Sequence, residues 1–208
     1  VDGLLEHLVD RKGRKPRRVH RLDRETSGVL VVARTRAAAA ALSDAFRDRT
    51  TRKIYWSLVK GVPKPPAGRI STFLAKETAG EVEKVAVRAR KGEDAQRAVS
   101  LYALVDHVGR KLSWLSMRPV TGRTHQLRVH AAHIGHPIVG DPKYFDAANR
   151  DLPGGIQNRL HLHARRLVMP HPDGGVLDVT APLPEHMRQS FSLLGFDAAA
   201  RDIPEPED

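Results

Sequence analysis

The chain has 208 residues, of which 40% are hydrophobic, enough for one domain (1–208) with a sizeable core. Its 35 lysines and arginines outnumber 24 aspartates and glutamates, giving a net charge of +11, and the lack of cysteine excludes disulfides, thiolate metal sites and a cysteine nucleophile. No apolar run approaches the ~20 residues of a membrane span and residues 1–10 do not resemble a signal peptide, so we expect a cytoplasmic protein.

Hydrophobic patterning predicts strands mixed with helices. In chain order we expect a short buried strand (29–32), a helix (37–46), an alternating strand (53–59), a turn (63–68), three strands (81–90, 98–105, 112–117), a helix (124–134), a segment of undecided type (160–167), a strand (176–180) and a helix (185–194). Strands and helices do not alternate regularly, which favours an α+β fold over a doubly wound sheet.

Two of these segments have a clear periodicity. Along the strand at 53–59, Tyr55 is expected on the opposite face from Ile54 and Trp56. The helix at 124–134 has an apolar face, whose members are Leu127, Ala131 and Ile134.

The most informative motif precedes the first strand and reads His20-Arg21-Leu22-Asp23-Arg24-Glu25-Thr26-Ser27-Gly28. A carboxylate among guanidinium groups stays ionised, which suits Asp23 to act as a nucleophile or charge stabiliser rather than as a general acid. The residues from Thr26 to Gly28 favour a turn, so Asp23 is expected on a tight loop. An isolated Arg-x-Asp would be an ordinary surface ion pair, but the nine-residue run is far more specific.

Two further motifs carry candidate functional residues. The first is Arg52-Lys53-Ile54-Tyr55-Trp56, where a phenol offers a flat stacking surface and a polar tip, although such a tyrosine is more often part of a core. The second is Arg118-Pro119-Val120-Thr121-Gly122-Arg123-Thr124-His125-Gln126-Leu127-Arg128-Val129-His130, followed by Gly135-His136-Pro137-Ile138-Val139-Gly140-Asp141-Pro142-Lys143-Tyr144.

Together these motifs resemble those of the pseudouridine synthases, in the branch typified by bacterial large-subunit ribosomal RNA enzymes. The matching patterns are H-R-L-D-x-x-T-S-G, K-x-Y, and G-R-T-H-Q-[IL]-R-x-H with its continuation G-H-P-I-x-G-D-x-x-Y. The small-subunit branch reads more like N-R-Q-I-R-R-M at the third block. Because residues 160–184 also resemble the family's closing segment, the likeness covers nearly the whole chain.

The resemblance implies a fold and a set of roles. The fold would be a mixed, mostly antiparallel sheet with flanking helices and loops around a central RNA-binding cleft. Asp23 would be catalytic, by covalent attack or by stabilising a glycal-forming transition state, and Arg128 would hold it through a charge-assisted hydrogen bond that can be bidentate. Tyr55 would stack on the target uracil and accept the C2′ proton if a glycal forms. Arg21 would fill the space that the flipped base vacates, and Leu127 would line the uracil site, though it is equally good as a core residue.

The remaining predicted RNA contacts are basic or polar. His20 and Thr26 are expected to shape the catalytic loop, and the others are Arg17, Arg18, Arg123 and His125. Most RNA affinity should come from a basic run before and around the loop, whose members are Arg11, Lys12, Arg14, Lys15, Arg17, Arg18, Arg21 and Arg24. A merely soluble, arginine-rich protein is the plainer explanation of the net charge, but the clustering favours a nucleic acid.

A metal site is the main competing interpretation of the histidines, which are His125, His130, His133, His136, His161 and His163. No H-E-x-x-H motif is present and the family needs no metal, so we expect neither a metal nor a cofactor.

The expected function is isomerisation of specific RNA uridines to pseudouridine, in large-subunit ribosomal RNA first and transfer RNA second. A non-catalytic RNA-binding protein and a metallo-nuclease are the alternatives. We expect a monomer with no membrane association. The family's opening K-P-x-G strand and its common S4 domain are not visible in this sequence, as would be the case for an incomplete or trimmed chain.

Overall fold

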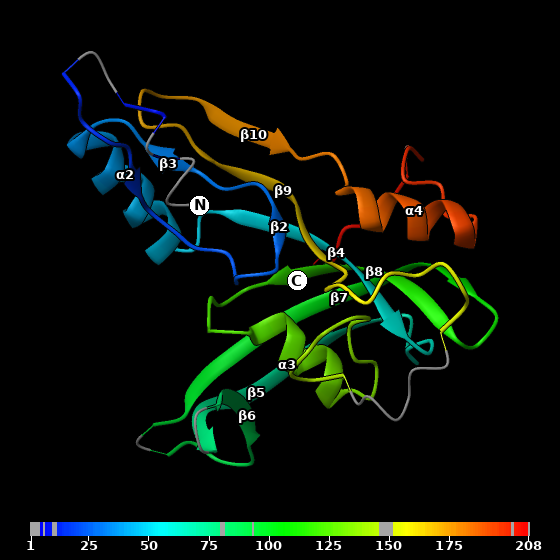
Figure 1. The fold of residues 1–208 in the computed structure, drawn as a ribbon. Coiled ribbons are helices and arrows are strands. Elements are labelled where there is room, and N and C mark those ends of the chain that lie inside the picture. The colour runs from blue at the N-terminus through cyan, green and yellow to red at the C-terminus, as the bar shows by residue number, and fades with distance from the viewer. Residues whose placement is uncertain are drawn as a thin grey trace.

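The computed structural model describes residues 5, 7–9, 12–79, 82–92, 94–145, 152–200 and 202–207. Its centre is an eight-stranded sheet in the order β10-β9-β4-β8-β7-β5-β6, with β2 beside β9, while β1 and β3 form a separate pair (Figure 1). The described strands are β1 (Arg17–Arg18), β2 (Ser27–Gly28), β3 (Val32–Ala33), β4 (Arg52–Lys60), β5 (Ala67–Ala79), β6 (Val82–Arg88), β7 (Gln96–Val108), β8 (Leu112–Pro119), β9 (Leu162–Pro170) and β10 (Val176–Thr180). The helices are α2 (Arg36–Arg47), α3 (Gln126–His133) and α4 (Glu185–Leu194). The parallel pairing of β2 with β9 is the exception in an otherwise antiparallel sheet, so the predicted α+β fold is confirmed.

The two faces of β4 belong to different cores, as its alternation predicted. Ile54 and Trp56 pack with Phe191 of α4 in one apolar cluster. Tyr55 packs against the other cluster, which contains Leu127 of α3. The sheet therefore lies between α3 and α4 at this point, and β4 connects the two cores.

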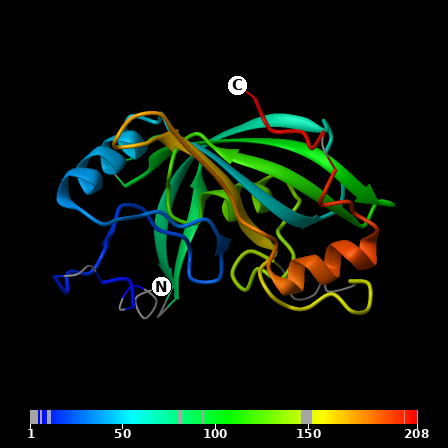
Figure 2. The same ribbon diagram turned by 90° about the horizontal axis from the view of Figure 1, so that it is seen from above.

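The helix α2 packs at one end of the molecule. Its buried Leu42 joins a cluster with Val29 and Met169, which covers the β9 end of the sheet. The Thr35 hydroxyl caps the helix by accepting a hydrogen bond from the Ala38 N–H at 3.1 Å. Figure 2 shows α2 and α4 at opposite ends of the molecule, with the sheet between them.

Several predicted elements differ from the structure. The strand expected at 29–32 was largely wrong, because residues 29–31 lie between β2 and β3 and only Val32 belongs to β3. The Val31 N–H donates to the His20 ring (Nε2, 2.8 Å) rather than to a neighbouring strand. The turn at 63–68 is shorter than predicted, since β5 begins at Ala67, and the rest of β5 was not predicted. The segment at 160–167, left undecided, forms the start of β9. Glu81, the first residue of the strand predicted at 81–90, lies outside the described residues.

The predicted helix at 124–134 begins two residues later, as α3, because His125 has a left-handed backbone (φ 52°). None of the helices in the described part of the chain has the length and apolar content that a membrane crossing requires.

Candidate active site

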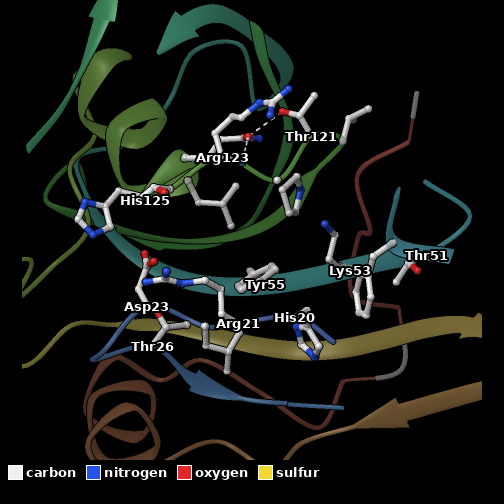
Figure 3. A pocket seen from close by; sticks show the side chains of 18 of the residues that line it. His20, Arg21, Asp23, Thr26, Thr51, Lys53, Tyr55, Thr121, Arg123 and His125 are labelled. Carbon is white, nitrogen blue, oxygen red and sulfur yellow. Dashed lines mark hydrogen bonds between the residues drawn. The ribbon is translucent and has the colours of Figure 1, made fainter. Parts of the chain in front are cut away.

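A pocket of about 570 Å³, within the usual range for a ligand site, lies where three separate segments meet (Figure 3). Its walls come from the loop before β2, from the start of β4, and from the segment that joins β8 to α3. Eight of the predicted site residues line it, namely His20, Arg21, Asp23, Thr26, Tyr55, Arg123, His125 and Leu127. The structure therefore brings together residues that are more than 100 positions apart in the sequence.

Asp23 lies on a tight turn, as predicted. The Thr26 N–H donates to the Asp23 carbonyl at 3.0 Å, and the chain then enters β2. Gly28 ends that strand with a φ of 116°, and a Cβ there would overlap the Ala164 backbone. The loop is thus held close against β9, and the Asp23 side chain keeps 19% of its surface exposed to the pocket region.

The expected pairing of Arg128 with Asp23 is only partly present. The Arg128 guanidinium donates from Nε and Nη2 to the two carboxylate oxygens of Asp141, both at 2.7 Å, while its Nη1 lies 3.8 Å from Asp23 Oδ2. The contact with Asp23 is therefore an ion pair and not the expected hydrogen bond, and the bidentate geometry is formed with Asp141 instead. Burial alone would lower the pKa of Arg128, but the hydrogen bond to Asp141 and the nearby Asp23 charge outweigh it and raise the pKa.

Tyr55 forms part of the pocket wall beside Asp23. The pairing of β4 with β9 shifts register between Ile54 and Tyr55, a type of irregularity that is common next to active sites. Burial and, secondarily, the Asp23 charge raise the pKa of the Tyr55 phenol, which stays protonated at neutral pH. A neutral ring of this kind suits stacking and hydrogen-bond donation.

His20 supports the loop that carries Asp23 through a ring contact and a hydrogen bond. Its ring stacks on Phe46 with 4.6 Å between centroids, and its Nε2 accepts the hydrogen bond from Val31. Burial and then the Lys53 charge lower the pKa of His20 to about 4, so the imidazole is neutral and can accept this bond. This geometry agrees with a loop-shaping role.

The opposite wall is organised by Gln126, whose side chain is buried. Its Oε1 accepts from the Thr121 hydroxyl (2.6 Å) and the Arg123 N–H (3.0 Å), and its Nε2 donates to the Val99 carbonyl at 2.9 Å. Two of these bonds appear as dashed lines in Figure 3. They fix the segment before α3 so that Arg123 lies at the pocket.

His125 and Tyr144 connect this wall to the Arg128 ion pair. The Tyr144 hydroxyl lies 2.9 Å from His125 Nδ1, and the Arg128 guanidinium lies over the Tyr144 ring, 5.2 Å from its centroid. Neither Asp141 nor Tyr144 received a role from the sequence, although both belong to the Gly140-Asp141 continuation of the third motif.

Some predicted RNA contacts lie elsewhere. Arg17 and Arg18 form β1 and are exposed, outside the pocket. Arg11, also part of the basic run, lies outside the described residues. Lys53 lines the pocket but was not among the predicted site residues, although it is the lysine of the K-x-Y motif.

Five of the six histidines that suggested a metal site, all except His133, lie within hydrogen-bond distance of other protein groups. His130 Nδ1 lies 2.9 Å from the Ser100 hydroxyl, and His161 Nε2 lies 2.8 Å from that of Ser190. In the portion of the chain that the structure describes, no three histidines or acidic residues are grouped so that they could hold a metal ion.

Comparison with known proteins points to one family. The model of a family described as RNA pseudouridylate synthase matches residues 5–133, which include Asp23, Tyr55 and Arg128. The ribosomal large subunit pseudouridine synthase C of Yersinia pestis is 35% identical over 185 residues, covering 88% of this chain and 57% of the relative. An uncharacterized RNA pseudouridine synthase of Zymomonas mobilis is 39% identical, covering 88% of this chain and 78% of the relative.

The solved structure of human RNA pseudouridylate synthase domain containing 4 superposes with a TM-score of 0.75 at 29% identity, covering 92% of this chain and 80% of that one. The chain spans 51–59% of the length of several curated relatives that it matches. The family model covers more than half of the chain, including its pocket loop, and the fold extends the likeness to nearly all of it; the chain belongs to the RNA pseudouridylate synthase family.

Proposed function

We propose that this chain converts uridine to pseudouridine in RNA, with Asp23 as the catalytic carboxylate and no cofactor. The reaction breaks the N1–C1′ bond, turns the uracil, and forms a C5–C1′ bond, while a proton leaves C5 and one is gained at N1. Atoms are conserved, so no redox partner or nucleotide is needed. The observation that carries the proposal is the position of Asp23, whose carboxylate lies 3.8 Å from Arg128 and which lines, together with Tyr55, a pocket of nucleoside-accommodating size.

Each neighbour of Asp23 has a defined part in this chemistry. Arg128 supplies a fixed positive charge 3.8 Å from the Asp23 carboxylate, and this charge would help to orient it. Tyr55 stacks on the uracil, and its raised pKa keeps the phenol neutral while it does so. Leu127, buried at the pocket wall, provides apolar contact for the base. Covalent attack on C1′ and stabilisation of a glycal-forming transition state are both compatible with these positions.

The target base must leave its stack to reach Asp23, at a cost of a few kcal/mol. Arg21 is exposed at the pocket and can stack in the vacated space. Arg49 and Arg123 add positive charge around the same opening, and the exposed Arg17 and Arg18 extend it beyond the pocket. Phosphate neutralisation by these groups supports an RNA substrate.

Large-subunit ribosomal RNA is our first choice of substrate, because several relatives are named as ribosomal large subunit pseudouridine synthases. Transfer RNA is the second choice. We further propose one catalytic domain over residues 1–208, a monomeric state, and, from the cysteine-free composition, a cytoplasmic location.

The test is pseudouridine mapping on total RNA from cells that lack the gene, after incubation with the protein or with Asp23→Asn. New pseudouridine with the wild type and none with Asp23→Asn supports the proposal and identifies the target. New sites in transfer RNA alone would replace the first choice of substrate by the second. No new pseudouridine from a folded wild-type protein would refute the activity and leave an RNA-binding protein on the same fold.

A further inference from the structure

Lys53 is a lysine in the pocket that the proposed chemistry does not use. It precedes Tyr55 by two residues on β4, so both side chains are on the same face of the strand, about 6.6 Å apart along it. Both line the pocket, and Figure 3 shows the Lys53 amine pointing into the open space. Lys53 therefore lies next to Tyr55, the residue on which the uracil would stack, on the same face of β4.

The charge of Lys53 has no anionic partner in the described part of the protein. Among the residues that the structure describes, no carboxylate forms a salt bridge with it and no acceptor hydrogen-bonds its amine. The side chain is half-buried, and burial lowers the pKa of its ammonium group. Partial burial of an unpaired ammonium group costs free energy, because the charge loses part of its hydration. An anion that enters with the substrate would remove this cost.

The space next to the amine is kept open by Gly122. A Cβ at this position would have the Lys53 Nζ as its one neighbour within 4 Å, at 3.9 Å. Gly122 also does not have the positive φ that demands glycine. Neither packing nor backbone geometry requires glycine here, and its lack of a side chain leaves the Lys53 amine accessible from the pocket.

We propose that Lys53 binds a backbone phosphate of the target nucleotide or its immediate neighbour, and so positions the ribose C1′ against Asp23. This inference rests on the proposed function, because it places the uracil on Tyr55 and the ribose at Asp23. A phosphodiester is the anion that every RNA substrate carries next to the reacting ribose. A uracil carbonyl is neutral and would compensate a buried ammonium group less well than a phosphate does.

The experiment compares the wild type with Lys53→Met, Lys53→Arg and a control, Lys84→Met. Lys84 is exposed on β6, at the far edge of the sheet and outside the pocket. Binding of a fluorescein-labelled oligouridine of about ten nucleotides is measured at several KCl concentrations. Loss of one phosphate contact should make the slope of log K against log [KCl] shallower by about 0.7. We expect this change and a roughly tenfold weaker binding at low salt in Lys53→Met, recovery in Lys53→Arg, and neither effect in Lys84→Met.

A thermal unfolding measurement on the free proteins separates this role from a structural one. Lys53→Met should unfold at the same or a higher temperature than the wild type, since an unpaired buried charge is replaced by an apolar chain. A lower midpoint with an unchanged salt slope would show a structural role and overturn the proposal. A reduced preference for oligouridine over oligoadenosine at an unchanged slope would assign Lys53 to the base and also overturn it.

Binding to oligouridine needs no turnover, so this result is independent of the mapping experiment. If the wild type forms no pseudouridine, the proposed function fails whatever Lys53 does. If it forms pseudouridine and Lys53→Met retains the wild-type slope, only the role of Lys53 fails.

Discussion

The ion pair between Arg128 and Asp141 should contribute far more to stability than a second pair with the same geometry on the surface. Asp141 has no exposed side-chain surface and Arg128 has 6%. Arg166 and Asp178 are also joined by two hydrogen bonds, at 2.8 and 2.6 Å, but their side chains are 38% and 43% exposed. The substitutions Asp141→Asn and Asp178→Asn keep the shape of each side chain, and each removes the charge and replaces one of two acceptor oxygens by an NH2 donor, so the change in hydrogen bonding to the arginine is matched between the two sites.

Removing one partner of a buried pair costs up to about 3–5 kcal/mol, because the other charge stays buried and loses its compensation, whereas an exposed pair contributes about 0–1 kcal/mol. In Asp141→Asn, Arg128 would keep, among the described residues, only the longer ion pair with Asp23 at 3.8 Å. For a chain of this size, the first loss corresponds to a fall of about 6–20 °C in the unfolding midpoint. Arg166 also keeps an ion pair with Glu205 at 2.9 Å when Asp178 is changed. Urea and thermal unfolding of both variants at pH 7.5 measure the difference. If Asp141→Asn were no more destabilised than Asp178→Asn, the reasoning from burial would be refuted.

Three further results are expected. Burial lowers the pKa of four histidines to about 4. These histidines are His20, His130, His161 and His163. As the pH falls below 6.5, the unfolded chain therefore takes up protons before the folded chain does, and stability is lost down to about pH 4, by up to about 1.4 kcal/mol per pH unit for each histidine. Urea unfolding should show a lower free energy of unfolding at pH 5 than at pH 7.5, and equal values would contradict this prediction. Gly28→Ala should lower the free energy of unfolding by about 3 kcal/mol or more, because φ is 116° and the new Cβ meets the Ala164 backbone. Gly154→Ala is the control, since a Cβ there lies in open space, and its free energy of unfolding in the same assay should stay within about 0.5 kcal/mol of the wild-type value. Burial raises the pKa of Tyr55, so the wild type and Tyr55→Phe should show the same pH dependence of pseudouridine formation between about pH 7 and 9. A change of rate with rising pH that is present only in the wild type would argue against a neutral phenol.

Elements with a strong local pattern were predictable from the sequence. The helix at 185–194 and the strand at 176–180 have the predicted bounds in α4 and β10. The alternation around Tyr55 also assigned the two faces of β4 correctly, because each face is buried against a different helix. In these segments local patterning and tertiary burial agree.

The strand β5 was missed because little in its own sequence indicates a strand. Ile70, Leu74 and Ala75 are buried, while the polar residues between them give no regular alternation. Its position depends on pairing with β7, where Ala67 lies opposite Ala103, and with β6 on its other side. The start of β5 pairs with β7 alone, which joins residues distant in sequence, and a local window does not contain this pairing.

The hydrogen-bond partner of Arg128 in the site could not be predicted from the sequence either. The sequence identified Asp23 and Arg128, but a guanidinium has a limited set of donors and two carboxylates can compete for them. Asp141 accepts hydrogen bonds from Nε and Nη2 of Arg128 because it is buried beside this side chain. Which carboxylate bonds the guanidinium therefore depends on the tertiary structure. The bonding of Arg128 to Asp141 also has a chemical consequence. A bidentate bond from Arg128 would occupy both oxygens of Asp23, whereas an ion pair at 3.8 Å provides positive charge and, among the described residues, leaves the carboxylate without a hydrogen-bond donor. The arrangement that the sequence did not predict is therefore the one that better suits the proposed approach of the Asp23 carboxylate to C1′.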